Sequence, residues 1–197
     1  MRFGFFPGEA TLGKRESAGM VDIKKIDWEK LKSPCASFSS FIPDPKQVGF
    51  IADRLLNDYL NMSDETRSKE YVDFVLKSYF FGKKFNVFYK IKDFAGFVGF
   101  VDIHPNYKAK VIMTFWDKKA FTHNFVRDAT VLFDVFAKEF DLMRLYSQTA
   151  DDRIVWMAKK AGFKQECIQK NAFKWKGRLM PIIQLSITHD EKKRRSG

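Results

Sequence analysis

The side chains that could perform chemistry are few and scattered along the chain. His123, in the stretch KKAFTHNFVRDA, could act as a base or bind a phosphate, although a loop histidine without an evident partner is more often exposed to solvent. Asp151 and Asp152 open the stretch DDRIVWMAKKAGFKQE, where acids at the start of a helix complement its dipole. Neither stretch is a ready-made catalytic motif. The chemistry therefore has to be inferred from the elements that position these residues.

Cysteine and histidine usage gives no metal-binding pattern. Cys35 and Cys167 are far apart, and His104, His123 and His189 do not cluster with cysteines or carboxylates. We therefore expect no metal ion, and two free thiols in a reducing, cytoplasmic compartment. No run of about 18 apolar residues is present, which predicts no transmembrane helix and no membrane partner. The apolar stretch at the N-terminus is too short for a signal-peptide core.

The net charge of +11 and the pI near 9.6 favour an anionic partner: nucleic acid, an acidic protein or a polyanionic cofactor. No arginine-rich run, zinc-finger spacing or aromatic RNA-binding signature supports sequence-specific nucleic-acid binding, so that reading rests on charge alone. With 197 residues, 45% of them hydrophobic, the chain is long enough for one domain with a sizeable core. Its 22 Phe favour a core packed with phenylalanine over an aromatic contact surface.

Hydrophobic periodicity predicts that the N-terminal part holds one strand, two helices and three further strands. Residues 1–19 lack periodicity and are interpreted as an extension. The predicted elements are a strand at 20–27, a loop at 33–45, a helix at 46–60, a second helix capped by Ser63 with Asp64 and Glu65 in its first turn and ending near Gly82, and strands at 85–93, 96–103 and 108–116. Short connectors join the last three strands, which indicates an antiparallel meander.

The C-terminal part alternates between helical and strand patterns. The predicted elements are a helix at 125–140, a buried strand at 142–149, a helix from Asp151 to Gly162, strands at 163–170 and 181–188 joined by residues 171–180 with a turn at Lys176-Gly177, and a basic tail at 189–197. Gly162 is expected to end its helix in a left-handed conformation. The helix at 125–140 connects two strands as a crossover does, so we predict an α+β domain with a mixed sheet over residues 20–188.

This order of elements resembles the GNAT acetyltransferase superfamily. The resemblance is closest to the branch that includes the ribosomal-protein N-terminal acetyltransferases. It is carried by EFDLMRLYSQTADDRIVWMAKKAGFKQE, which resembles the family's strand, helix and Gly-Phe corner, and by FKWKGRLMPIIQLSI, which resembles its closing hairpin. The resemblance implies a largely antiparallel sheet that is splayed at its centre and flanked by helices. It also implies that acetyl-CoA is bound as co-substrate between the strands at 109–116 and 142–148.

The resemblance also assigns residues to the site. The pyrophosphate would lie on backbone N–H groups of the loop that leads into the helix at residue 125, because unsatisfied N–H groups and the positive end of a helix dipole attract phosphate. The implied cofactor-binding residues are Phe115, Lys118, Lys119, Thr122, His123, Asn124, Phe125 and Arg127. Asp102 and His104 lie where some relatives keep a general base, and His123 is a third candidate. For each of the three, a polar residue that meets water is the more common case than a catalytic base.

The sequence departs from the family at three places. The family's phosphate loop reads Arg/Gln-x-x-Gly-x-Gly/Ala, whereas residues 118–129 contain no glycine, and Phe121 and His123 stand where small residues usually allow the backbone to approach phosphate. Asp151 stands where the helix usually opens with Asn. Ala158 stands where many relatives place a Tyr general acid. Lys118, Lys119 and Arg127 could compensate by supplying charge, and Asn124 could tolerate a left-handed conformation.

Two functions follow from the resemblance and its departures. The first is an acyl-CoA-dependent N-acyltransferase that moves an acetyl group to an amine of a protein, peptide or small molecule by direct attack. The second is a GNAT-fold protein, for example a phage-encoded one, that has lost acetyl-CoA binding and serves as a structural or protein-interaction module. Both readings leave room for a protein partner or assembly.

Overall fold

The computed structural model describes residues 26–58, 64, 68–82 and 85–189. Its elements are α1 (Trp28–Lys32), β1 (Phe38–Ser40), α2 (Pro45–Asp58), α3 (Lys69–Phe81), β2 (Val87–Ile91), η2 (Lys92–Phe94), β3 (Gly96–His104), β4 (Lys108–Phe115), η3 (Lys118–Ala120), α4 (His123–Glu139), β5 (Arg144–Thr149), α5 (Asp152–Lys160), β6 (Lys164–Trp175) and β7 (Arg178–Thr188). The predicted extension at 1–19, and the tail at 189–197 apart from His189, lie outside the described residues. No described helix is long and apolar enough to span a bilayer.

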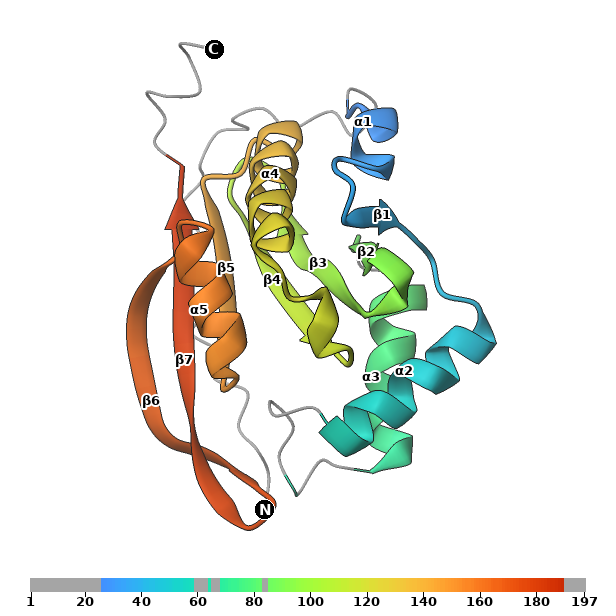
Figure 1. Cartoon of the computed structure of the whole chain (residues 1–197), viewed down its shortest axis with the longest axis vertical. Coiled ribbons are helices and arrows are strands. Elements are labelled where there is room, and N and C mark those ends of the chain that lie inside the picture. The colour runs from blue at the N-terminus through green and yellow to red at the C-terminus, as the bar shows by residue number, and fades with distance from the viewer. Residues whose placement is uncertain (1–25, 59–63, 65–67, 83–84, 190–197) are drawn as a thin grey trace, which may run out of the picture.

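The strands form one seven-stranded sheet in the order β1-β2-β3-β4-β5-β7-β6. Every pairing is antiparallel except that of β4 with β5, which is parallel because the crossover through α4 returns the chain in the same direction. The predicted α+β fold with a mixed, largely antiparallel sheet and a three-strand meander is therefore confirmed. Helices α4 and α5 lie side by side across one face of the sheet (Figure 1).

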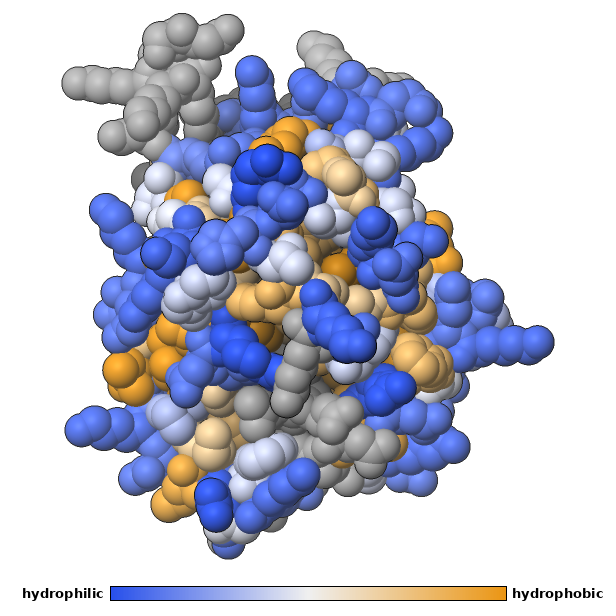
Figure 2. Space-filling view, viewed as in Figure 1, coloured by the Kyte–Doolittle hydropathy of each residue, from blue (hydrophilic) through white to orange (hydrophobic). Residues whose placement is uncertain are grey.

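Each face of the sheet has its own core. The larger core packs α4 and α5 against residues such as Val111 and Leu145, and it is rich in phenylalanine, with Phe100 stacked on Phe136 at 3.6 Å between ring centroids. The smaller core packs α2 and α3 against Phe97 and Val101 on the other face. The predicted phenylalanine-packed core is confirmed. On the α4/α5 face, hydrophilic residues dominate and hydrophobic residues gather toward the middle (Figure 2).

Several predicted boundaries were wrong at the N-terminal part. The predicted loop at 33–45 contains β1, which pairs with β2 at the edge of the sheet. Of the predicted strand at 20–27, only Ile26 and Asp27 are described; they precede α1, and Asp27 caps it. The second helix begins at Lys69 with Ser68 as its N-cap, not at Ser63. Its predicted end at Gly82 is confirmed.

The C-terminal hairpin is longer than the sequence indicated. Residues 171–180, predicted as a connector, belong mostly to β6 and β7, and only the predicted turn at Lys176-Gly177 separates the two strands. Asp64, which was predicted to lie in a helical turn, instead accepts hydrogen bonds from the backbone N–H groups of Lys176 and Gly177 at 2.7 and 2.9 Å. A tertiary contact thus uses the carboxylate that the sequence pattern assigned to a helix dipole.

Asp128 of α4 anchors the segment between α1 and β1. The residue is 6% exposed, and its carboxylate accepts hydrogen bonds from the backbone N–H and the hydroxyl of Ser37 at 3.1 and 2.6 Å. A buried carboxylate is tolerated only where hydrogen bonds replace its hydration. The edge strand β1 is therefore tied to the central helix through one acidic side chain.

We expect Asp128→Ala to lower the free energy of unfolding by about 2–3 kcal/mol, because it leaves two partly buried donors of Ser37 without their charged acceptor. Asp128→Asn keeps one acceptor oxygen and should lose less. Asp134→Ala, an exposed change on the same helix, should stay within about 0.5 kcal/mol. Urea denaturation followed by circular dichroism measures all three. Equal stabilities for the Asp128 and Asp134 variants would contradict the stabilising role of the hydrogen bonds between Asp128 and Ser37.

The two cysteines are free and differ in environment. Cys167 is exposed, whereas the Cys35 thiol lies 3.3 Å from the backbone carbonyl oxygen of Asp128. Burial, reinforced by the Asp128 carboxylate, raises the pKa of the Cys35 thiol to about 11. The reactive thiolate of Cys35 is therefore scarce below that pH in the folded protein.

At pH 8 we expect Ellman's reagent to titrate one thiol of the native protein rapidly and the second only after denaturation. Raising the pH toward 11 should accelerate the slow thiol, because ionisation of Cys35 then becomes accessible. The Cys167→Ser variant should lack the fast phase and keep the slow one. Two rapid thiols at pH 8 would show that Cys35 is not shielded.

Candidate active site

The central feature is a separation of β4 from β5. The two strands pair at only three positions, Lys108–Arg144, Ala109–Leu145 and Lys110–Tyr146. Beyond them, residues 111–115 stay paired with β3 and residues 147–149 stay paired with β7, but not with each other. Along residues 111–115 and 147–148 the facing edges therefore have no partner strand in the described structure, which leaves this part of the sheet open to an extended ligand. The predicted central splay is confirmed.

The start of α4 lies at the open end of this groove. The chain leaves β4 through η3 and enters α4 at His123, so both α4 and α5 begin at the end where the strands diverge (Figure 1). Thr122 is the N-cap, and its hydroxyl accepts a hydrogen bond from the N–H of Phe125 at 3.2 Å. The N–H groups of His123 and Asn124 have no acceptor within the helix. Thr122, His123 and Asn124 are thus at the helix terminus, two residues earlier than the predicted start.

The loop into α4 needs no glycine for its backbone shape. No described residue between Asp117 and Ala129 has a positive φ, and Asn124 is helical, so the suggested left-handed conformation of Asn124 was wrong. The remaining argument for glycine is close approach of a phosphate to the backbone. Both His123 and Asn124 are exposed.

Aromatic rings connect the two helices on this face. Phe121 lies against Phe115 at the end of β4, against Phe125 of α4 and against Trp156 of α5, with ring centroids 5.4, 5.9 and 5.6 Å apart. His123 also meets Trp156, at 6.4 Å. The predicted site residues Phe115, Phe125 and His123 are therefore brought together. Phe121, which the sequence suggested only as an obstruction, and Trp156 join them.

The acid at the start of α5 is neutralised by its own helix. Asp151 is 8% exposed and accepts hydrogen bonds from the backbone N–H and the guanidinium of Arg153, the N–H at 2.9 Å. This contact raises the pKa of the Arg153 guanidinium further. A carboxylate in this arrangement presents little free charge to a phosphate. At the other end of α5, Gly162 has φ 95°, which confirms the predicted left-handed C-cap.

The cationic candidates surround the start of α4. Lys119 and Arg127 are exposed, and the Arg127 guanidinium lies 3.6 Å from the Asp128 carboxylate. Lys118 opens η3 in the same connection. Two exposed cations beside free helix N–H groups form an environment that favours an anion.

The three candidate bases are not brought together. His123 lies at the open end of the groove, and His104 is an exposed residue at the end of β3, opposite Lys108. Asp102 lies at an irregularity of β3 with φ 49°, and its charge acts on Lys110. Lys110 is the last β4 residue paired with β5, so Asp102 is the candidate near the closed end of the groove.

Sequence reasoning missed two residues at this closed end, Lys110 and Tyr146, which face each other in the last β4–β5 pair. Burial lowers the pKa of the Lys110 ammonium, although the charge of Asp102 partly offsets it. A signal was present in both strands. Lys110 interrupts the apolar pattern of KAKVIM, and Tyr146 follows three apolar residues and one cation in LMRLY.

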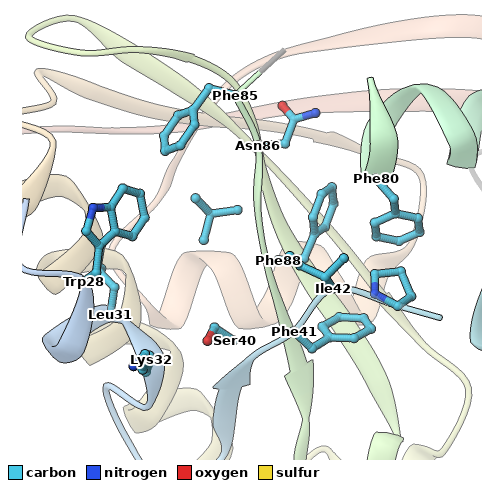
Figure 3. Close-up of a pocket in the computed structure, with 12 residues that line it drawn as sticks. Trp28, Leu31, Lys32, Ser40, Phe41, Ile42, Phe80, Phe85, Asn86 and Phe88 are labelled. Atoms are coloured by element: carbon cyan, nitrogen blue, oxygen red, sulfur yellow. The ribbon is translucent and has the colours of Figure 1, made fainter. Parts of the chain in front are cut away.

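A separate cavity lies at the other edge of the sheet. It has a volume of about 590 Å³ and is lined mainly by apolar side chains from α1, α3, β2 and the segments after β1 and before β2, among them Trp28, Phe41, Phe80, Phe85 and Phe88 (Figure 3). None of the predicted site residues lines it. The described residues also hold no group of three or more His, Cys, Asp or Glu side chains placed to bind a metal ion.

The mixed sheet that opens at a parallel pair, with a crossover helix starting at the opening, is the GNAT acetyltransferase fold. The RimL ribosomal L7/L12 alpha-N-protein acetyltransferase, solved with coenzyme A, superposes with a TM-score of 0.61 at 16% identity over 81% of this chain and 98% of that one. A spermidine N-acetyltransferase from Vibrio cholerae, solved with CoA and spermine, gives 0.59 at 15% identity over 77% and 95%.

A third solved structure, an acetyltransferase of the GNAT family from Bacillus anthracis, gives a TM-score of 0.55 at 13% identity over 78% of this chain and 95% of that one. No protein-family model matches the sequence, and no curated protein matches it either. The likeness is thus one of fold, and it extends over nearly the whole length of each solved structure.

Proposed function

We propose that the protein is an acetyl-CoA-dependent N-acetyltransferase that transfers an acetyl group to an amine. The observation that carries this proposal is the groove between β4 and β5, because it places unpaired strand edges directly beside the free N–H groups of α4. A strand edge can hold an extended amide-bearing chain, and a helix N-terminus can hold a pyrophosphate. Coenzyme A combines these two chemical features in one molecule.

In this proposal, three sets of residues bind acetyl-CoA. The N–H groups of His123 and Asn124, with the charges of Lys118, Lys119 and Arg127, hold the phosphates. Thr122 fixes the helix start that presents those groups. The rings of Phe115 and Phe125, together with Phe121 and Trp156, form the apolar wall beside the bound chain.

Acetyl-CoA would supply the acyl group as a thioester, and the residues at the closed end of the groove would act on the acceptor. A free N–H of the β4 edge donates to the acyl oxygen and stabilises the negative charge that develops there. The amine nitrogen forms the new C–N bond as the C–S bond breaks and CoA leaves as a thiolate, which takes up a proton from water, so the protein needs no nucleophile of its own. We assign removal of the amine proton to Asp102, which lies closer to this end than His123 does.

The acceptor would approach from the α2/α3 face, because α4 and the cofactor-binding residues occupy the other face. The solved structures of this fold include acetyltransferases named for a ribosomal protein and for spermidine. The fold is therefore compatible with a protein, a peptide or a small amine as acceptor. The residues around the closed end of the groove would determine which of these acceptors is selected.

Acetyl-CoA should raise the melting temperature of the full chain. A ligand at about 100 times its dissociation constant stabilises a protein by about 2.7 kcal/mol. It should also change tryptophan fluorescence, and the Trp156→Phe variant should lose most of that change while keeping the thermal shift. Adenosine alone serves as the control ligand. No thermal shift at millimolar acetyl-CoA would contradict the proposal and favour a GNAT-fold module without cofactor.

A further inference from the structure

The face of the sheet that would receive the acceptor carries a row of polar and cationic side chains. Lys110 pairs with Tyr146, Tyr146 with Ser186, and Ser186 with Lys164, across β4, β5, β7 and β6. Residues opposite each other in neighbouring strands point to the same face. The alternate residues, such as Leu145, belong to the α4/α5 core. The row therefore lies on the α2/α3 face, beside the closed end of the groove.

Two more cations flank this row. The Lys108 ammonium and the Arg144 guanidinium each lie 5.8 Å from the ring centroid of Tyr146. Tyr146 is thus surrounded by positive charge that its ring face attracts. Lys110, at the centre of the row, is half-buried, so its charge is less screened by water than that of a surface lysine.

The acids in this region do not cancel the positive charge. Glu166 is committed to its neighbours: its carboxylate accepts hydrogen bonds from Arg144 at 2.5 and 2.7 Å and from the Ser186 hydroxyl at 2.6 Å. Asp102 acts on Lys110, and it is the second acid near the row. Four cations, Lys108, Lys110, Arg144 and Lys164, therefore face two acids.

The positive charge continues along the β6–β7 hairpin. Between residues 164 and 178 the only acid is Glu166. Lys170, Lys174, Lys176 and Arg178 are all exposed there. Asp64 binds the hairpin turn through its carboxylate, so the turn is held near the connection between α2 and α3. Of the hairpin cations, Arg178 lies on the same face of the sheet as the row, whereas Lys174, which pairs with Leu179, points to the opposite face.

We propose that the acceptor is the N-terminal amine of an acidic peptide segment, with the carboxylates that follow the amine bound by Lys108, Lys110 and Lys164. This inference rests on the proposed acetyltransferase function and specifies its acceptor. A polyamine would bring further positive charge next to Lys110 and would be repelled. An α-amine has a pKa of about 7.7–8.0, against about 10.4 for an alkylamine, so it reaches its nucleophilic neutral form more easily near neutral pH.

The test compares three acceptors with the full chain, by release of free CoA. They are a ten-residue peptide that begins with Ser and continues with Asp and Glu, the same peptide with Lys at the acidic positions, and spermidine. We expect kcat/KM for the acidic peptide to exceed that for the other two by about tenfold or more at low salt, and to fall as salt is added. Equal or better use of spermidine, with a normal thermal shift by acetyl-CoA, would overturn this inference and leave the proposed function intact.

Charge-reversal variants test which cations produce the preference for the acidic peptide. Lys110→Glu combined with Lys164→Glu should raise KM for the acidic peptide about tenfold while the thermal shift by acetyl-CoA stays unchanged. Lys92→Glu, an exposed change on the β2–β3 connection, should leave both unchanged. Fluorescence anisotropy of the labelled acidic peptide gives a readout that does not depend on acetyl transfer. If the peptide fails to bind, or if single-stranded RNA displaces it from these cations at equal charge, the surface does not select an acidic peptide.

Discussion

Replacement of Gly96 by alanine is expected to lower the free energy of unfolding by about 3 kcal/mol, because the added methyl group has no space to occupy. Gly96 begins β3 opposite Phe115. A Cβ there would overlap the backbone carbonyl oxygen of Thr114 and lie 3.0 Å from the Cα of Phe115. Backbone atoms cannot rotate away as a flexible side chain can, so the end of β4 must move.

The matched control is Gly49→Ala in α2, where a Cβ would meet nothing within 4 Å. Alanine is favoured over glycine inside a helix, so this variant should be more stable by about 0.5–1 kcal/mol. Urea denaturation of the two variants beside the parent protein gives the comparison. A Gly96→Ala protein as stable as the parent would show that β3 and β4 are not held as closely as described here.

Reversal of charge at the start of α4 is expected to weaken acetyl-CoA binding by about tenfold for each of Lys119→Glu and Arg127→Glu, and by more for the pair. Both side chains are exposed, so the substitutions leave the core unchanged. Each places a carboxylate where the proposed phosphates would lie, which adds repulsion to the lost attraction. The loss should shrink at high salt, because exposed charges are screened.

Lys138→Glu is the control for this pair, since it changes the same charge at the opposite end of the same helix. It should cost a little stability, because a cation in the last turn complements the dipole, but should leave the dissociation constant for acetyl-CoA unchanged. Isothermal titration calorimetry with acetyl-CoA separates the two effects. Equal losses at Lys138 and Lys119 would point to nonspecific electrostatics instead of a phosphate site.

The elements that were predicted best are those in which the hydrophobic periodicity of the sequence matches the side that is buried in the fold. The helix that became α4 carries apolar residues such as Leu132 and Phe136 at helical spacing, and most of them are buried on one side. The α5 helix with its glycine corner was predicted for the same reason. Ser63 and Ser68 are both serines followed within two residues by an acid, so local sequence could not separate them. In the structure, Asp64 accepts hydrogen bonds from a distant hairpin turn, and the helix begins after Ser68 instead.

The missed strands share a different cause. Strand β1 lies in a segment rich in serine and proline, and it forms because β2 offers a partner edge and Asp128 holds Ser37. The outer part of the β6–β7 hairpin is exposed, so it lacks the hydrophobic alternation on which strand prediction depends. Neither case is visible without the tertiary structure.

The candidate site was predictable in its location but not in its details. The loop into α4 and the two inner strands were identified from the resemblance, and the opening between those strands follows from register alone. The contact of Phe121 with Trp156 joins residues from different elements, so no spacing in the sequence predicts it. The row through Lys110 likewise depends on three strand pairings that only the sheet reveals.

The three β4–β5 pairs have a mechanical consequence. In the described sheet, these are the only residue pairs that join strands β1 to β4 with strands β5 to β7. The sheet therefore consists of two halves that are connected along only three residue pairs. Amide protons of residues 111–115 and 147–148 that face the opening lack a partner strand and should exchange with solvent faster than those of the three β4–β5 pairs. A ligand that contacts both halves of the sheet would restrict their motion relative to each other. Slower amide hydrogen exchange along both facing edges would report this effect.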